Sequence, residues 1–207
     1  SDYAKETWTQ QVERADSIEL YTEYALYTAA IQNPSAVTVD LLATLEQQNP
    51  KSKYLDEGYP RYFLALTQTG AAAKIPAIAE AALQHFPENE DLLMVLAESA
   101  LSKQQKDKAL SHADRLAAVL AKHPKPESMS AADWQRKRNQ ELGRAHWIAG
   151  IVRCDKADYV KGDKSLRLAL PLIGDNKEMR TAALFYLGVA NFQLGATTFN
   201  KARVLEA

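Results

Sequence analysis

The chain has 207 residues, of which 46% are hydrophobic and 25% are charged, an ordinary composition for a soluble globular protein. Its 8 glycines and 8 prolines form no Gly-rich turns, which argues against an all-β fold. No segment approaches the roughly 18 consecutive apolar residues that span a bilayer, so we expect no transmembrane segment. The single cysteine, Cys154, excludes an intrachain disulfide and a cysteine-rich metal site.

The net charge is −1, but the charges are unevenly distributed along the chain. Residues 1–100 carry 6 Lys and Arg against 15 Asp and Glu, whereas residues 101–207 carry 19 against 11. Such an asymmetry can orient a charged partner or favour head-to-tail self-contact, and it can equally reflect solvated faces of opposite bias. We interpret the start at Ser1 rather than Met as the removal of upstream residues, either as a signal peptide or by cloning. The compartment therefore stays open between cytoplasmic and periplasmic or secreted.

The first helices are predicted from apolar periodicity and capping residues. Residues 2–15 form a lead-in helix, and Asp16 or Ser17 offers a cap for a second helix over about 17–32. Pro34 ends that helix, and a short partner helix follows it.

The second hairpin is clearer, because each of its helices carries one apolar stripe. Gly70 turns the chain between the two helices, and Pro60 and Pro76 are expected in first turns. The stripe of the first helix consists of Tyr59, Tyr62, Phe63 and Leu66, and that of the second of Ile75, Ala79 and Ala82.

The third hairpin, residues 90–124, places small residues where its two helices face each other. Pro124 ends it, and Phe63 and Ala97, which fill the same slot in successive units, are 34 residues apart. The facing small residues are Ala97, Ala100, Ala109 and Ala113.

Beyond the third hairpin the regular spacing of the helices changes. A helix is predicted from Ser130 to about Cys154, and its polar first turns are expected to project past the neighbouring hairpins. A partner helix over about 159–170 follows it. The last hairpin has Gly195 as its turn glycine, and its second helix has barely started when the chain reaches Ala207.

Large and small residues alternating in units of about 34 residues resemble the tetratricopeptide repeat. The family pattern is matched by Leu184, Leu187, Gly188 and Gly195 in the last unit, and by Gly150, Tyr159, Leu166, Ala169 and Leu170 in the fourth. In the second unit it is matched by Tyr59, Leu66, Gly70, Ala82 and Pro87.

The resemblance implies an all-α fold, a right-handed α-solenoid of antiparallel helix hairpins with about 11 helices. The whole chain, 1–207, would be a single superhelical domain. Its repeats would cover about 17–50, 56–87, 90–124, 130–176 with an extended first helix, and 177–207, the last incomplete. A plain antiparallel helical bundle is the alternative.

In this family the first helix of each unit lines a concave groove. Carried onto this chain, the groove slots expected to contact a partner are Tyr27, Leu64, Met94, Trp147, Ile151, Phe185, Val189 and Phe192. The other groove slots hold Glu23, Thr67, Asp91, Glu98, Leu101, Arg144, Cys154 and Asp155. A clamp for a terminal carboxylate is not expected, because the slot for its Asn holds Tyr, Leu, Glu, Ile and Val in successive units. The apolar residues can instead anchor a partner, or they can be covered by the protein itself.

No constellation of residues predicts catalysis. The four histidines lie in separate segments, and the zinc-protease, phosphate-loop, dinucleotide and nucleophile-elbow motifs are missing, so we expect no catalytic residues, metal or cofactor. Arg136-Lys137-Arg138 has Asp133 and Glu141 nearby, which favours a solvated surface over nucleic-acid binding.

We therefore expect a non-enzymatic scaffold that binds a peptide, a helix or a partner subunit in an apolar concave groove. The alternative is a structural spacer or dimerisation module whose groove is filled by the protein itself, with homodimer contact through the C-terminal repeats.

Overall fold

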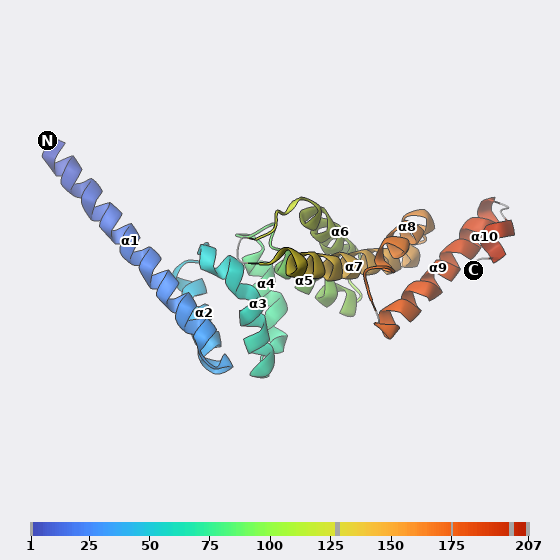
Figure 1. Cartoon of the computed structure of the whole chain (residues 1–207), viewed down its shortest axis with the longest axis horizontal. Coiled ribbons are helices and arrows are strands. Elements are labelled where there is room, and N and C mark those ends of the chain that lie inside the picture. The colour runs from blue at the N-terminus through green and yellow to red at the C-terminus, as the bar shows by residue number, and fades with distance from the viewer. Residues whose placement is uncertain (1, 127–128, 175, 199–200, 206–207) are drawn as a thin grey trace. The chain divides into compact units, whose positions relative to one another are not determined.

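The computed structural model describes residues 2–126, 129–174, 176–198 and 201–205. Within these ranges the regular structure is entirely helical, ten α-helices and one 3₁₀ turn, which confirms the predicted all-α class (Figure 1). The chain divides into two compact units, residues 1–89 and 90–207. The right-handed solenoid and the tetratricopeptide register stay predictions.

The first helix, α1, runs without a break over Asp2–Gln32, so the predicted interruption at Asp16 or Ser17 is wrong (Figure 1). No Gly or Pro occurs before Gln32, and nothing in this stretch stops a helix. The Ser17 hydroxyl donates a hydrogen bond to the carbonyl of Glu13 at 2.8 Å, as a Ser inside a helix does, instead of capping a new one. Residues 5–22 of α1 are exposed.

The last turns of α1 pack against α2 (Ser35–Gln48) and α3 (Lys53–Gln68). The buried Thr38 hydroxyl donates to the carbonyl of Ala30 at 2.7 Å and thereby joins α2 to α1. The four aromatic and aliphatic residues predicted for the stripe of α3 are all buried. Gly70 turns the chain as predicted, with φ at +77°, before the 3₁₀ turn η1 (Ala72–Lys74) and α4 (Ile75–Ala82).

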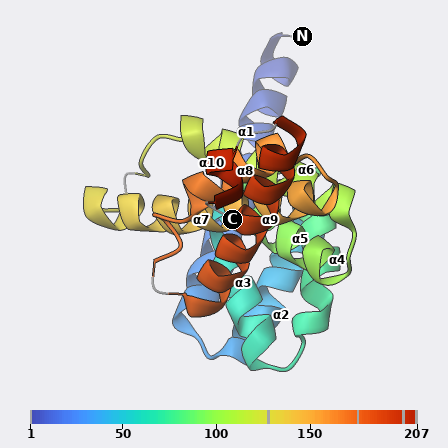
Figure 2. The same ribbon diagram turned by 90° about the vertical axis from the view of Figure 1, so that its right-hand side faces the viewer.

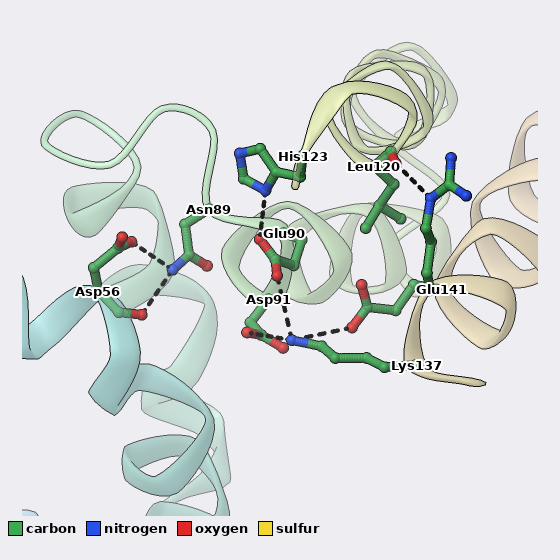
Figure 3. Close-up of polar contacts among 9 residues, drawn as sticks. Asp56, Asn89, Glu90, Asp91, Leu120, His123, Lys137 and Glu141 are labelled. Atoms are coloured by element: carbon green, nitrogen blue, oxygen red, sulfur yellow. Dashed lines mark hydrogen bonds and ion pairs between the residues drawn. The ribbon is translucent and has the colours of Figure 1, made fainter. Parts of the chain in front are cut away.

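Pro60 lies inside α3 and not in a first turn, because the helix begins at Lys53 with Ser52 as its cap. Proline has no N–H, so the carbonyl four residues earlier, that of Asp56, loses its usual helical donor. The side-chain amide of Asn89 fills this place: its Nδ2 lies 2.9 Å from the Asp56 carbonyl and 2.8 Å from Asp56 Oδ1 (Figure 3). The first unit thus tolerates an internal proline because the residue that ends the unit supplies the missing hydrogen bond.

The second unit contains α5 (Glu90–Ser102), α6 (Lys106–Lys122), α7 (Ala131–Asp155), α8 (Tyr159–Ala169), α9 (Lys177–Thr198) and α10 (Lys201–Leu205). Each helix packs on the next one in the chain, and α5 also contacts α7, as α7 contacts α9. Figures 1 and 2 both show α10 beside α9. The predicted start of α7 is confirmed: Ser130 caps it by accepting a hydrogen bond from the Asp133 N–H at 3.1 Å.

Small residues set the close packing of the two hairpins in this unit. Ala97 and Ala109 are completely buried between α5 and α6, as predicted. In the next hairpin a Cβ on Gly150 would lie 2.6 Å from Leu166 Cγ, and a Cβ on Gly162 would lie 2.4 Å from the sulfur of Cys154. Both distances are too short for non-bonded carbon or sulfur atoms, so α7 and α8 can meet this closely only with glycine at these two positions.

The connections within the two hairpins adopt the same left-handed turn. Gln104 after α5 has φ +57°, and Ala157 after α7 has φ +61°. In both, the next residue's N–H bonds back to the helix, from Gln105 to the Ala100 carbonyl and from Asp158 to the Arg153 carbonyl, closing the helix end.

Gly195 is not a turn glycine. It is buried inside α9, which continues to Thr198, so the turn predicted at this glycine is wrong. Glycine in a helix interior costs only about 1 kcal/mol relative to alanine, so packing against neighbouring residues readily keeps the helix intact. The expected end at Ala207 lies outside the described residues.

Candidate binding cleft in the second unit

A cleft of about 570 Å³ opens in the second unit between α5, α7 and the segment that joins α8 to α9. Its lining residues come from all three, namely Glu98, Leu101 and Ser102, then Gln140, Arg144, Trp147 and Ile148, then Leu172, Ile173, Asn176 and Met179. The α5 and α7 residues stand on the neighbouring faces of two contacting helices.

The interior of the cleft is apolar and its walls are held in place. The indole N–H of Trp147 donates to the carbonyl of Met179 at 2.9 Å, which fixes the ring between α7 and the start of α9. Leu172 rests on Gly143, where a Cβ would come within 2.9 Å of the leucine Cβ. Because its only polar atom is already bonded, Trp147 presents its apolar ring to the cleft.

The rim of the cleft is polar and electrically balanced. Arg144 on α7 forms an ion pair with Glu98 on α5, and both side chains are nearly half exposed. Asn176 accepts a hydrogen bond from the Met179 N–H at 3.0 Å and caps the start of α9. An apolar interior below a neutral, hydrogen-bonding rim is suited to an uncharged apolar group attached to a polar backbone.

Next to the cleft, a cluster of charged residues holds the first half of α7 against α5 (Figure 3). The ammonium of Lys137 lies 3.3 Å from Glu90 Oε1, 3.3 Å from Asp91 Oδ2 and 3.6 Å from Glu141 Oε1. On the other side of Glu90, His123 Nδ1 lies 3.4 Å from Oε2. We name Glu90, Asp91, Lys137 and Glu141 the seam cluster.

The polar first half of α7 is anchored to its neighbours by more than the sequence predicts, although its first turn is exposed at Ala131, Ala132 and Asp133. Trp134 is buried, and the Arg138 Nε donates to the carbonyl of Leu120 at the end of α6 at 2.7 Å. Sequence periodicity missed this because the stabilising contacts are ion pairs and hydrogen bonds to other helices, which leave no apolar stripe.

Glu141 is the most perturbed member of the seam cluster. Burial raises the pKa of its carboxyl to about 7; Lys137 acts against this rise, while Asp91 and Glu90 add to it. Its Oε2 atom is buried and has no hydrogen-bond partner. For Lys137, burial lowers the pKa, but Asp91, Glu141 and Glu90 together raise it above the ordinary value. Lys137 therefore stays charged while Glu141 can change its protonation state near neutral pH.

The eight groove residues predicted from the sequence have different surroundings within their own units. Of these, only Trp147 lines the cleft. In the first unit, Tyr27 stacks on Tyr54 with ring centroids 5.6 Å apart, and Leu64 is exposed on α3. In the second unit Met94 and Ile151 are buried, Val189 is half-buried, and Phe185 and Phe192 are exposed on α9.

Three further groove slots that the family resemblance implied, Glu98, Leu101 and Arg144, do meet in the cleft. The residues that sequence reasoning missed are Leu172, Ile173 and Met179, from the α8–α9 connection and the first turn of α9. A repeat template places such positions outside the groove, so no signal in the template could find them.

Within the described residues, no group of three or more His, Cys, Asp or Glu side chains is arranged to hold a metal ion. Burial raises the pKa of the Cys154 thiol to about 11, which disfavours the reactive thiolate. None of the described helices combines the length and apolarity that crossing a membrane requires.

Compared with known proteins, the chain matches no protein-family model, no curated protein and no solved structure.

Proposed function

We propose that the second unit is a non-enzymatic protein-interaction module whose cleft takes up an apolar side chain from a segment of a partner protein. The observation that carries this proposal is the cleft's combination of an apolar interior around Trp147 with the neutral Arg144–Glu98 rim. A volume of about 570 Å³ lies within the range of roughly 300–1,000 Å³ typical of binding pockets and exceeds the size of one large side chain. Aromatic residues at the centre of such sites commonly supply most of the binding energy.

The rim supports a peptide as the occupant. The exposed amide of Gln140 and the paired charges of Arg144 and Glu98 can exchange hydrogen bonds with a peptide backbone without requiring a charged ligand. The resemblance of the hairpins to tetratricopeptide units supports the same class of function.

The proposal is tested with random 12-residue peptides displayed on phage, selected on the full chain and then synthesised with a rhodamine label. We expect Trp147→Ala to weaken the selected peptides by about 30-fold in fluorescence anisotropy, the effect of an aromatic hot spot. Leu101→Gln, a substitution at a half-exposed wall residue, should weaken them by about tenfold without disturbing the fold. Val160→Ala, exposed on α8 and outside the cleft lining, is the control and should leave affinity unchanged.

Circular dichroism and thermal unfolding confirm that each variant is folded before affinity is compared. The proposal is wrong if no peptide is enriched, or if the selected peptides bind the two cleft variants as tightly as the original chain.

The free face of α9 supports a second candidate, a dimerisation module. On α7, Trp147, Ile151 and Cys154 contact α9, and the corresponding residues 38 positions later are Phe185, Val189 and Phe192. Phe185 is 66% exposed and Phe192 51% exposed. The face that α7 uses to receive its neighbour is thus left open on α9, and a second copy of the chain would cover it.

Sedimentation velocity at increasing protein concentration tests this second candidate. We expect a concentration-dependent dimer that the double variant Phe185→Ser, Phe192→Ser reduces to monomer, because it removes the aromatic contact area. A monomer at every concentration excludes dimerisation through α9.

A further inference from the structure

Glu141 occupies an unusual position for a carboxylate in the second unit. Its side chain is only 11% exposed, one oxygen lies 3.6 Å from Lys137, and the other oxygen is buried without a hydrogen-bond partner. An ionised carboxylate normally accepts several hydrogen bonds, and an unpaired buried charge is costly. The geometry therefore suits a neutral carboxyl group better than an ionised one.

The charges facing Glu141 reinforce this preference. From α5, Glu90 and Asp91 already share the Lys137 ammonium, so an ionised Glu141 becomes the third carboxylate around one lysine. At the end of α6, His123 contacts the far side of Glu90.

The two arginines nearest to Glu141 on α7 are engaged elsewhere. Arg138 bonds to the Leu120 carbonyl, and Arg144 pairs with Glu98.

The turn of α7 that carries Glu141 also builds the cleft. Gln140 and Arg144, one residue before and three after, line it, and Gly143 supports the cleft residue Leu172. A small displacement of this turn relative to α5 moves the lining residues Gln140 and Arg144, and Leu172 with them, relative to the α5 wall. The protonation state of Glu141 and the shape of the cleft are therefore mechanically connected.

We propose that proton uptake and release by Glu141 regulates the cleft, closing the α5–α7 seam around the bound peptide when the carboxyl is neutral and loosening it when the carboxyl is ionised. This inference rests on the proposed peptide-binding function for its consequence, although the movement of α7 can be measured without a peptide.

The direction follows from the charges. Below neutral pH Glu141 is neutral, and the Lys137 ammonium pairs with Glu90 and Asp91 alone. The first half of α7 then stays against α5. Above neutral pH the third negative charge repels the other two, and the ionised oxygen seeks water. Because burial raises the pKa of Glu141 to about 7, the change occurs between about pH 6 and pH 8.

The chain carries its own reporters for this movement. Trp134 and Trp147 lie on α7 on either side of Glu141, and Trp8 lies on the exposed part of α1 in the other unit. We propose to label the full chain with 5-fluorotryptophan and to follow the three fluorine resonances by NMR from pH 5.5 to pH 8.5. We expect the two α7 resonances to shift with a common midpoint near pH 7, while the Trp8 resonance shows no such step.

Two variants identify the titrating group. Glu141→Gln keeps the size of the side chain and makes it permanently neutral. Both α7 resonances should therefore become independent of pH and remain at their low-pH positions. His123→Gln is the matched control, because His123 contacts Glu90 of the seam cluster. The midpoint near pH 7 should persist in this variant. A titration that survives in Glu141→Gln, or that disappears in His123→Gln, overturns the proposal.

The second measurement is the affinity of a rhodamine-labelled peptide from the phage selection. We expect its Kd to rise at least about fivefold from pH 6 to pH 8, the lower end of usual coupling between sites, and to stay constant in Glu141→Gln. Equal affinity at both pH values in the original chain contradicts the regulation even if the fluorine resonances titrate. If no peptide binds, the peptide-binding function fails, whereas the fluorine titration still decides whether Glu141 moves α7.

Discussion

The two halves of α7 are held in place by different forces. Residues 131–144 are attached to α5 and α6 mainly through the seam cluster and the Arg138–Leu120 hydrogen bond. Residues 145–155 are attached by close apolar contact, with Ile148, Ala149 and Val152 each 1% exposed and Gly150 against Leu166. The first attachment consists mainly of ion pairs and hydrogen bonds to other helices. The second consists mainly of apolar packing, to which the ion pairs Arg153–Asp114 and Lys106–Asp155 add.

The cleft lies where the two halves meet. Gln140 and Arg144 come from the charged half, and Trp147 and Ile148 come from the apolar half. The cleft therefore takes part of its α7 wall from the charged contacts and part from the apolar packing.

The largest expected effect is a loss of folding stability when the apolar packing between α7 and α8 is disrupted. Gly162→Val places methyl groups where a Cβ already lies 2.4 Å from the Cys154 sulfur, and the sulfur is confined by its own buried surroundings. We expect a loss of about 3 kcal/mol in the free energy of unfolding, the upper end of usual overpacking costs. Chemical denaturation at pH 6 and pH 8 should give the same loss at both.

Lys164→Val is the matched control, because Lys164 is exposed on the same helix and the change there costs only about 0.5 kcal/mol. A Gly162→Val chain as stable as this control would contradict the close approach of α7 and α8.

A smaller effect on stability is expected from Glu141 in the charged half of α7, and unlike the loss in the apolar half it depends on pH. The folded pKa of Glu141, about 7, lies above its ordinary value of 4.5, so the folded state binds the proton more tightly. The stability that this group contributes is fully present below about pH 4.5 and is lost as the pH rises through about 7. Glu141→Gln should therefore raise the free energy of unfolding on the order of 2 kcal/mol at pH 8, and by less than half as much at pH 5.

Denaturation curves at the two pH values measure this difference, with Glu19→Gln, an exposed glutamate in the middle of α1, as the control that changes stability at neither. An equal gain at both pH values would mean that Glu141 is ionised in the folded protein throughout this range.

The local errors of sequence reasoning share one physical cause, namely contacts made by residues distant in the chain. Pro60 reads as a helix start, but Asn89, 29 residues later, supplies the hydrogen bond that lets α3 pass through it. Gly195 reads as a turn, but it is buried within α9. The break predicted at Ser17 is an exception, because the side chain satisfies itself locally and no helix-breaking residue is present.

By itself, the sequence determines the helical class and most hairpins, because stripes of apolar and small residues such as Ala97 and Ala109 encode which face of a helix is buried. It also encodes the turn at Gly70, since a left-handed backbone favours glycine. The cleft and the state of Glu141 are decided only by the tertiary structure. The Glu141 carboxyl keeps its proton near neutral pH because folding removes water from it and brings Glu90 and Asp91 close to it. The residues next to Glu141 in the sequence predict neither the burial nor these neighbours.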